Sequence, residues 1–293
     1  MTHEFDAQTA AAAEHLAILS LREDLDNRGD LTSEATIPEQ LSATVRIVAR
    51  QHGVLSGIGV VPLVFRYLPG KVRAESYVSD GEEVSAGTVI SELHGPVRTL
   101  LTGERTVLNF LTHLSGIATR TAEFVHTVRG TPAKILDTRK TLPGYRLLQK
   151  YAVRCGGGHN HRIGLYDGML IKDNHLAARG ASSCAGAVRA AREYLQSHQL
   201  TVPIEIEVDT LEQLRDALSE HPELVLLDNM SPEMLSQAIQ IRNEVAPRTL
   251  LEASGGVTLH TVRAIAETGV DRISVGSMTH SSPALDVAFD WPW

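Results

Sequence analysis

The chain has 293 residues, of which 43% are hydrophobic and 21% charged, and its formal net charge is −8 at pH 7. This composition is typical of a globular protein with one or two domains, and its acidic balance argues against a nucleic-acid backbone as partner. No apolar run approaches the roughly 20 residues of a membrane span, and the N-terminus does not resemble a secretion signal, so we expect a cytoplasmic protein.

The first third of the chain has the pattern of an antiparallel sheet. Residues 43–49 and 71–78 alternate apolar and polar side chains, and turn sequences follow at 79–81 and 85–87. Residues 78–93 are similar to the strand repeat of lipoyl or biotinyl carrier domains, but they contain no lysine. The similarity therefore predicts a sandwich shape without the carrier function.

A long amphipathic helix is predicted for residues 102–128. Leu108, Leu111, Leu114 and Ile117 recur at helical spacing, and Thr102 is placed to cap the N-terminus.

After Gly130 the pattern changes to alternating strands and helices. The strands are expected at 133–137, 169–172, 203–208, 224–228, 250–253 and 272–275, and the helices at 185–198, 211–221, 231–245 and 259–268. Repeated strand–helix units with short loops predict parallel strands and favour an α/β barrel whose site lies at the carboxyl ends of the strands. A doubly wound open sheet is the alternative, although no G-x-G-x-x-G follows the first strand.

Residues 137–175 form a cationic segment. They hold seven Lys or Arg residues against three Asp, a local charge of +4 where the rest of the chain carries −12. Such a segment in an acidic protein indicates a pocket for an anionic small molecule. The alternative is a solvated helix face, but the charges are interspersed with glycine-rich and apolar stretches.

The side chains of this segment suit different parts of an anion. Arg139 and Arg162 can each hold a carboxylate through two hydrogen bonds, whereas Lys140 and Lys172 are compact charges for phosphate or a single carboxylate oxygen. His161 can donate a hydrogen bond beside Arg162. His159 and His175 are interpreted as ligands, hydrogen-bond donors or structural groups. Arg146, Lys150 and Arg154 lie on a helix predicted for residues 144–154 and are interpreted as surface or anion-steering residues.

A second group of candidate residues is acidic. Glu205, Glu207 and Asp209 share one face of a predicted strand, and Asp228 ends the next one. Carboxylates on neighbouring strands, together with phosphate oxygens, form a natural Mg²⁺ site, and a metal ion or sugar hydroxyls would offset the cost of burying them. Pairing with Lys or Arg is the structural alternative.

Two glycine-containing loops follow the last two predicted strands, at 253–256 and 275–277. The first is expected to open directly onto a helix through Thr258. Backbone N–H groups and a helix N-terminus favour an anion there, and the last two loops of α/β barrels commonly bind phosphate. The two cysteines, Cys155 and Cys184, do not have the spacing of a structural zinc site or a disulfide framework.

Together these segments closely resemble the quinolinate phosphoribosyltransferase family over nearly the whole chain. The resemblance is carried by residues 23–33, 103–111, 114–119, 137–175, 205–207, 227–230, 252–256 and 274–280. Two pairs depart from the family pattern, namely Thr112-His113 in place of a more polar pair and Ser277-Met278 in place of smaller or aliphatic residues.

The resemblance implies an α/β plus α+β architecture, in which an N-terminal α/β sandwich domain precedes an incomplete, about seven-stranded α/β barrel. The expected division is 1–118 for the sandwich with the start of the linker helix, 119–278 for the barrel, and 279–293 for a tail that returns to the sandwich. It also implies a homodimer in which Arg105 reaches the partner's site.

The implied activity is transfer of phosphoribosyl from phosphoribosyl pyrophosphate to quinolinate with decarboxylation, which yields nicotinate mononucleotide for NAD biosynthesis. The resemblance places Arg105, Arg139, His161, Arg162 and Lys172 around quinolinate. It places Lys140, Glu207, Asp228, Ser254, Gly255, Gly256, Gly276 and His280 around phosphoribosyl pyrophosphate. Mg²⁺ is expected at Glu207 and Asp228. The catalytic residues are expected to be Lys140, Lys172, Glu207 and Asp228.

Three other functions fit parts of the sequence. A related phosphoribosyltransferase could use nicotinate or another acid, a carrier module could use the lipoyl-like segment, and a barrel aldolase could form a Schiff base at Lys172. The missing lysine disfavours the carrier, and substrate competition separates the two transferases.

Overall fold

The computed structural model describes residues 4–180 and 183–293, and the chain divides into two compact units. The first comprises the chain up to Ala122 together with Lys140–Gly157 and Ser277–Trp293, and the second comprises Glu123–Arg139 and Gly158–Gly276. This division differs from the expected one, because the segment 140–157 groups with the first unit rather than with the barrel. No helix in the described part of the chain has the length and apolar character to cross a membrane.

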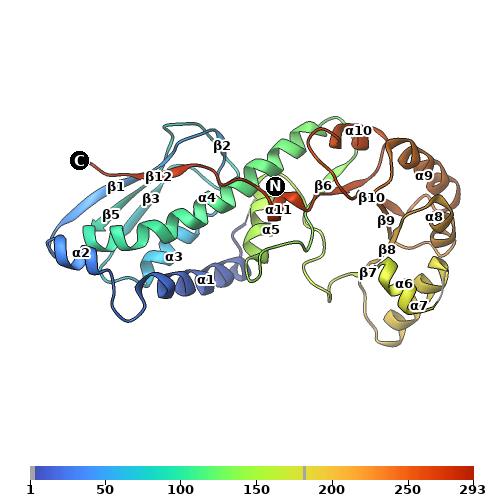
Figure 1. The fold of residues 1–293 in the computed structure, drawn as a ribbon, viewed down its shortest axis with the longest axis horizontal. Coiled ribbons are helices and arrows are strands. Elements are labelled where there is room, and N and C mark those ends of the chain that lie inside the picture. The colour runs from blue at the N-terminus through green and yellow to red at the C-terminus, as the bar shows by residue number, and fades with distance from the viewer. Residues whose placement is uncertain (1–3, 181–182) are drawn as a thin grey trace. The chain divides into compact units, whose positions relative to one another are not determined.

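The first unit is built on an antiparallel sheet with the strand order β12-β1-β5-β3 (Figure 1). Its strands are β1 (Ser42–Ala49), β3 (Arg73–Ser76), β5 (Val89–Pro96) and β12 (Val287–Asp290). A separate pair joins β2 (Gly53–Val54) to β4 (Glu83–Val84). Strand β12 pairs with β1 through Ile47 opposite Phe289, so the C-terminal residues complete a sheet that begins early in the sequence.

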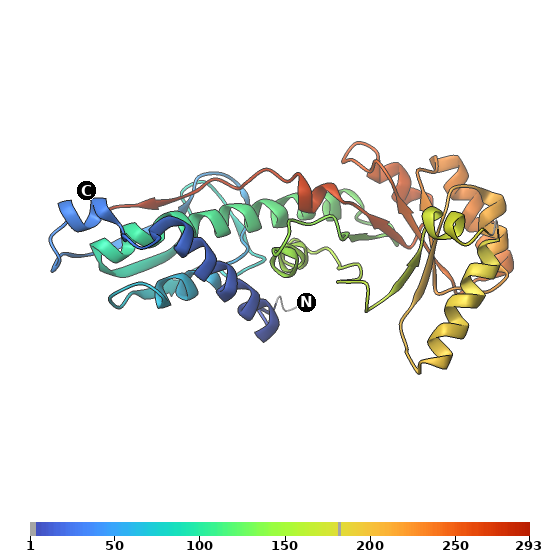
Figure 2. The ribbon, with the colours of Figure 1, turned by 60° about the horizontal axis from the view of Figure 1, so that its bottom comes forward.

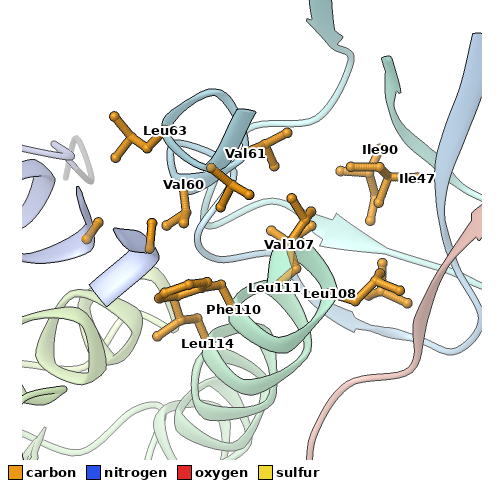
Figure 3. Close-up of a cluster of buried hydrophobic side chains, with 14 of the residues drawn as sticks. Ile47, Val60, Val61, Leu63, Ile90, Val107, Leu108, Phe110, Leu111 and Leu114 are labelled. Carbon is orange, nitrogen blue, oxygen red and sulfur yellow. The ribbon is translucent and has the colours of Figure 1, made fainter. Parts of the chain in front are cut away.

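The helices of this unit build its core together with the sheet. They are α1 (Ala7–Leu25), α2 (Leu31–Thr36), α3 (Val60–Arg66), α4 (Val97–Thr127), α5 (Arg146–Cys155) and the short α11 (Ser277–His280). Of these, α1, α3, α4 and α5 supply the helical side chains of that core. Figure 3 shows Leu108 of α4 on the side of Ile47 and Ile90 of the sheet, and Leu111 belongs to the same buried cluster. Truncating Leu111 to alanine would cost about 2–5 kcal/mol, the usual range for a fully buried leucine.

Helix α4 begins earlier than predicted. It starts at Val97, directly after β5, and Thr102 lies inside it with its hydroxyl donating to the carbonyl of Arg98 at 2.8 Å. Thr102 is therefore not the N-cap. The prediction was wrong because a threonine before a run of apolar residues can be either an N-cap or an interior residue whose hydroxyl donates to the carbonyl four residues earlier, as Thr102 does.

The second unit contains a parallel sheet with the strand order β6-β11-β10-β9-β8-β7. The strands are β6 (Lys134–Leu136), β7 (Met169–Ile171), β8 (Ile204–Val208), β9 (Leu224–Asp228), β10 (Leu250–Ser254) and β11 (Arg272–Ser274). Each lies within two residues of its predicted position. Strands β6 and β7 are the outermost strands of this sheet, as in an incomplete barrel. Six strands are formed within the described residues rather than seven, and His159 adds only an isolated parallel bridge to Leu136.

Crossover helices connect these strands and lie along one side of the sheet (Figures 1 and 2). They are α6 (Asp173–Ala178), α7 (Cys184–Ser197), α8 (Leu211–Leu218), α9 (Pro232–Val245) and α10 (Val262–Glu267). Local sequence explains where they begin. Thr210 and Gln213 form a capping box at α8, and Ser231 caps α9 ahead of Pro232. Both cysteines are free and buried.

Candidate active site

The carboxyl ends of the parallel strands gather most of the predicted residues at one edge of the sheet. Asp228 is in register with Ser254, Val208 with Leu227, and Ser274 with Leu136. Side chains at or just beyond these positions therefore share one edge. In the second unit this edge carries Arg139, Lys172, Glu207, Asp228, Ser254, Gly255, Gly256 and Gly276.

Asp137 organises the start of this edge. Its carboxylate is fully buried and accepts hydrogen bonds from the Asn160 amide at 2.6 Å and from the His161 backbone N–H at 2.8 Å. The backbone N–H of His159 also donates to Ile135 at 2.8 Å. These bonds hold residues 159–162 beside β6, so the loop that presents His161 and Arg162 has a fixed backbone.

His161 lies in a buried cluster with two glutamates. Its Nε2 is 3.0 Å from Oε2 of Glu205 and 3.4 Å from Oε1 of Glu252, and Arg272 Nε donates to the other oxygen of Glu252 at 2.7 Å. The sequence suggested that a metal ion or sugar hydroxyls would compensate the buried carboxylate of Glu205. In the structure, His161 contacts this carboxylate and compensates the cost of burying it. Without such partners these buried carboxylates would carry a large desolvation cost.

The cluster shifts the proton affinities of its members. Burial lowers the pKa of His161, but hydrogen bonds to Glu205 and Glu252 outweigh it and raise the pKa to about 9. Burial raises the pKa of both glutamates. At Glu252 the contacts with His161 and Arg272 prevail and lower it, whereas at Glu205 burial prevails and the pKa is raised.

The geometry specifies where the imidazole proton lies. The backbone N–H of Arg162 donates to Nδ1 of His161 at 2.7 Å, so the ring carries its proton on Nε2 and donates it to Glu205. This contact opposes a second proton on the ring, against the direction of the raised pKa. An additional proton in the cluster is therefore better placed on Glu205, whose pKa is also raised.

The same geometry argues against a metal ion in this cluster. Within residues 4–180 and 183–293, the one group of three candidate ligands that lie within 4.8 Å of one another is His161, Glu205 and Glu252. A metal on Nε2 would require the ring proton to move to Nδ1, where it would meet the Arg162 N–H. The cluster is thus a set of hydrogen-bonded side chains that fixes the His161 ring.

Arg162 and Arg139 contribute two positive charges to the second unit, and the charge of Arg139 acts on Arg162. Arg162 donates to the carbonyl of Gly168 at 2.8 Å, and its guanidinium is partly buried. Burial and the charge of Arg139 lower the pKa of Arg162. A bound anion would therefore stabilise the charge of Arg162.

The acidic residues lie on the neighbouring strands. Lys172 Nζ makes a short hydrogen bond to Oε2 of Glu207, with the lysine side chain 44% and the glutamate side chain 13% exposed. The structural pairing considered for these acids is therefore present at Glu207. Asp228 is half-buried and accepts a hydrogen bond from the Asn229 amide at 2.7 Å. Asp209 is exposed beyond the end of β8.

The glycine loop after β10 differs from its prediction. Gly255 and Gly256 have φ values of +91° and +58°, a conformation that favours glycine. However, the loop does not open directly onto a helix, because residues 257–261 intervene before α10 begins at Val262. Thr258 donates its backbone N–H to Thr261 instead. Any anion here would meet loop N–H groups without a helix N-terminus.

Three predicted residues belong to the first unit. Arg105 is exposed on α4, Lys140 is exposed and accepts a hydrogen bond at its carbonyl from Thr279 at 2.8 Å, and His280 is exposed at the end of α11. Their roles stay predictions. Of the two histidines left open, His175 accepts the Lys172 N–H at 3.0 Å within the first turn of α6, while burial lowers the pKa of the half-buried His159.

Comparison with known proteins then identifies the family. The sequence profile described as the N-terminal domain of quinolinate phosphoribosyl transferase matches residues 30–115, and the profile of its C-terminal domain matches residues 117–290. The chain belongs to the quinolinate phosphoribosyltransferase family. The resemblance seen in the sequence is therefore confirmed, as is the expected fold class.

Several relatives cover almost the full length. The chain is 48% identical over 273 residues to a nicotinate-nucleotide pyrophosphorylase [carboxylating] from Mycobacterium leprae, covering 92% of this chain and 94% of that protein. It is 39% identical over 285 residues to a mitochondrial quinolinate phosphoribosyltransferase [decarboxylating] from Nicotiana tabacum, covering 92% and 79%. The solved nicotinate-nucleotide pyrophosphorylase from Francisella tularensis has a TM-score of 0.88 at 39% identity and covers 96% of both chains.

Some site residues of this family member were not singled out by sequence reasoning. Asp137, Glu252 and Arg272 support the predicted residues through buried contacts, and Asn229 joins Asp228 to the glycine loop. Glu252 sits in an otherwise apolar strand, and such a lone acid was a usable signal. The partners of the others depend on pairing between distant segments, which local patterns do not encode.

Proposed function

We propose that this protein transfers the phosphoribosyl group of phosphoribosyl pyrophosphate to the nitrogen of quinolinate and removes the 2-carboxylate as CO₂. The products are nicotinate mononucleotide and pyrophosphate, as needed for NAD biosynthesis. The observation that carries the proposal is that Arg139, Lys172, Glu207 and Asp228 lie at or just beyond the carboxyl ends of the strands of one parallel sheet. The printed names of the full-length relatives support the same reaction.

The cationic part of the edge suits the aromatic dicarboxylate. Each guanidinium can hold one carboxylate through two hydrogen bonds, and a bound dianion would offset the effect of the Arg139 charge on Arg162. His161 has its ring fixed by Glu205 and Glu252, and Lys172 adds a fourth cationic or donor group. Arg139, Arg162 and Lys172 are thus proposed to bind quinolinate directly, and His161, whose two ring nitrogens are engaged by Arg162 and Glu205, is proposed to line the quinolinate site.

The acidic and glycine-rich part suits the activated sugar. Glu207 and Asp228 can accept hydrogen bonds from ribose hydroxyls. A Cβ added at Gly256 would meet no atom within 4 Å, so there is open space for a phosphate beside this glycine. Ser254, Gly255 and Gly276 lie on the same edge. Lys140 and His280 are proposed to contact the phosphates as well.

The donor set also fits a Mg²⁺ ion. Glu207 and Asp228 supply hard carboxylate oxygens from neighbouring strands, although Glu207 shares one oxygen with Lys172. When bound, the ion would neutralise charge on the departing pyrophosphate. Asp228 is therefore proposed as the more available ligand.

The reaction balances without a covalent enzyme intermediate. The pyridine nitrogen forms a bond to the anomeric carbon as the bond from that carbon to pyrophosphate breaks. The ring is then a pyridinium, and it stabilises the electron pair left at its 2-position when CO₂ departs, after which that carbon takes up a proton. The residues of the protein therefore act by orientation and by electrostatic stabilisation, with Glu207 and Asp228 facing the positive charge that develops on the sugar.

We also propose a homodimer in which Arg105 completes the partner's quinolinate site. The support is that Arg105 is exposed on α4, together with the family resemblance of residues 103–111.

The decisive experiment is incubation of the purified protein with Mg²⁺, phosphoribosyl pyrophosphate and quinolinate labelled at the 2-carboxylate. Labelled CO₂ and nicotinate mononucleotide are expected in equal amounts. A parallel reaction with nicotinate tests the related transferase. Turnover of nicotinate with no CO₂ from quinolinate would refute the proposal.

A further inference from the structure

Asn229 links two parts of the proposed phosphoribosyl site. It follows β9 directly, and its Nδ2 donates to Oδ2 of Asp228 at 2.7 Å. Its backbone N–H donates to the carbonyl of Ser254 at 2.9 Å, one residue beyond the pairing of Asp228 with Ser254. One residue therefore contacts both the acidic end of β9 and the start of the glycine loop.

The backbone of Asn229 adopts an uncommon conformation. Its φ is +53°, in the left-handed region that asparagine tolerates better than most residues other than glycine. Gln199 and His221 of the same unit have similar values, but they follow helices α7 and α8 at a distance in sequence from any predicted site residue. At Asn229 this conformation lets the backbone bind Ser254 while the side chain turns back to Asp228.

The side chain of Asn229 also explains one of the two loop glycines. A Cβ at position 255 would lie 2.2 Å from Oδ1 of Asn229, well inside any real contact, whereas a Cβ at position 256 would meet nothing within 4 Å. Gly255 therefore leaves room for the asparagine amide, and Gly256 is the glycine that borders open space. The two glycines have different reasons to be there.

We infer that Asn229 is a positioning residue that orients the Asp228 carboxylate and the Gly255–Gly256 loop toward phosphoribosyl pyrophosphate. The inference rests on the proposed function for the identity of the ligand. By holding one oxygen of Asp228, the amide sets the direction of the other. By occupying the space above Gly255, it sets the shape of the loop. Asn229 itself needs no contact with the substrate.

The test compares variants that keep the backbone conformation. Asn229→Gly retains a left-handed φ but removes the amide, and Asn229→Asp retains the shape but replaces the N–H donor with a second carboxylate beside Asp228. Gln199→Gly is the matched control, because it removes an exposed amide side chain from a residue with φ +55° in the same unit. Thermal unfolding of all three checks that each variant is folded.

The readout is binding of phosphoribosyl pyrophosphate with Mg²⁺, measured by calorimetry without quinolinate, and then KM for each substrate. Both Asn229 variants are expected to raise Kd and KM for phosphoribosyl pyrophosphate by about tenfold or more, equivalent to the loss of one hydrogen bond to a charged group. KM for quinolinate should stay within about twofold, and Gln199→Gly should match the wild type. Equal loss of affinity for both substrates would indicate a merely structural role and overturn the inference.

A second measurement tests the contact with Gly255. Gly255→Ala introduces a Cβ that collides with Asn229, in addition to the strain of alanine at φ +91°. The affinity penalty of this substitution should be several-fold smaller in an Asn229→Gly background than in the wild type. Equal penalties in the two backgrounds would show that the residues act independently.

The two proposals fail in different ways. If the wild-type protein binds no phosphoribosyl pyrophosphate at all, the proposed function is wrong and this inference falls with it. If the wild type binds the compound and Asn229→Gly binds it equally well, only the positioning role is wrong.

Discussion

The Nε2 of His161 lies 3.0 Å from Oε2 of Glu205, and Glu252 approaches the same nitrogen at 3.4 Å. The folded protein therefore binds a proton between His161 and Glu205 in a pH range where the unfolded chain does not. The sign is the same for either placement, because the pKa of His161 is raised to about 9 and that of Glu205 is raised as well. The stabilisation from this proton is complete below the ordinary histidine pKa near 6.5 and is lost as the pH rises to about 9.

Glu205→Gln should remove this dependence. In the wild type we expect the free energy of unfolding of the second unit to fall between pH 6.5 and 9, by on the order of 3 kcal/mol at most. The variant keeps the side-chain shape but needs no additional proton, so its profile should be nearly flat. Urea unfolding across this pH range measures both. Parallel profiles for the two proteins would show that the proton is bound elsewhere.

Replacing either guanidinium should impair catalysis strongly. Arg139→Ala and Arg162→Ala are each expected to lower kcat/KM for quinolinate by about 100-fold or more, corresponding to roughly 3 kcal/mol of transition-state stabilisation. The matched control is Arg263→Ala, which removes an exposed arginine paired with Glu267 in α10 of the same unit. Steady-state kinetics would exclude both arginines from the site if they gave near-normal values.

Asp137 should matter for the shape of the quinolinate site more than for its charge. Asp137→Ala leaves the Asn160 amide and the His161 N–H without their acceptor, so we expect a loss of stability of about 1.5–3 kcal/mol per charged hydrogen bond. KM for quinolinate should rise at the same time, whereas binding of phosphoribosyl pyrophosphate should change little. Asn160→Ala removes one of the two bonds and should give a smaller effect in the same direction. The order is checked by chemical unfolding and calorimetry, and a larger effect from Asn160→Ala would contradict this account.

The strands could be predicted from the sequence, whereas most side-chain partners could not. Strand β9 was placed at its observed bounds, because an apolar run ending in Asp228 is a strong local signal in a parallel sheet. The pairing of His161 with Glu252 depends on the order of strands in space, since β10 reaches the loop after β6 only through β11. Local periodicity contains no information about such pairs.

The same limit applies to the assignment of loops to functions. The sequence indicated that glycines 255 and 256 share one purpose, yet only the φ values and the position of the Asn229 amide distinguish them. Likewise, the acids of β8 look equivalent in the sequence, but Glu205 meets His161 and Glu207 meets Lys172. Candidate residues were thus identifiable by type, while their individual surroundings required the structure.

Removal of Mg²⁺ should abolish turnover without unfolding the protein. The His161 cluster supplies its own hydrogen bonds, and Glu207 is paired with Lys172, so we expect chelation to leave the melting temperature unchanged when substrates are absent. Activity should return when Mg²⁺ is added. Asp228→Asn should raise the Mg²⁺ concentration needed for half-maximal rate more than Glu207→Gln does, because Asp228 is not occupied by a lysine in the structure. Titration of the rate with Mg²⁺ decides the order, and the reverse order would identify Glu207 as the main ligand.

Mixing two inactive variants tests whether Arg105 acts in the partner's site. Arg105→Ala and Lys172→Ala subunits should each be inactive alone, by loss of one proposed quinolinate contact. In a mixed dimer, the barrel of the Arg105→Ala subunit retains its own Lys172 and receives a wild-type Arg105 from the other chain, so one of its two sites is complete. Random exchange makes half of the dimers mixed, and the recovered activity should be about one quarter of the wild-type value. Differently tagged subunits purified in tandem verify the mixed dimer, and no activity in that fraction would rule out supply of Arg105 across the interface.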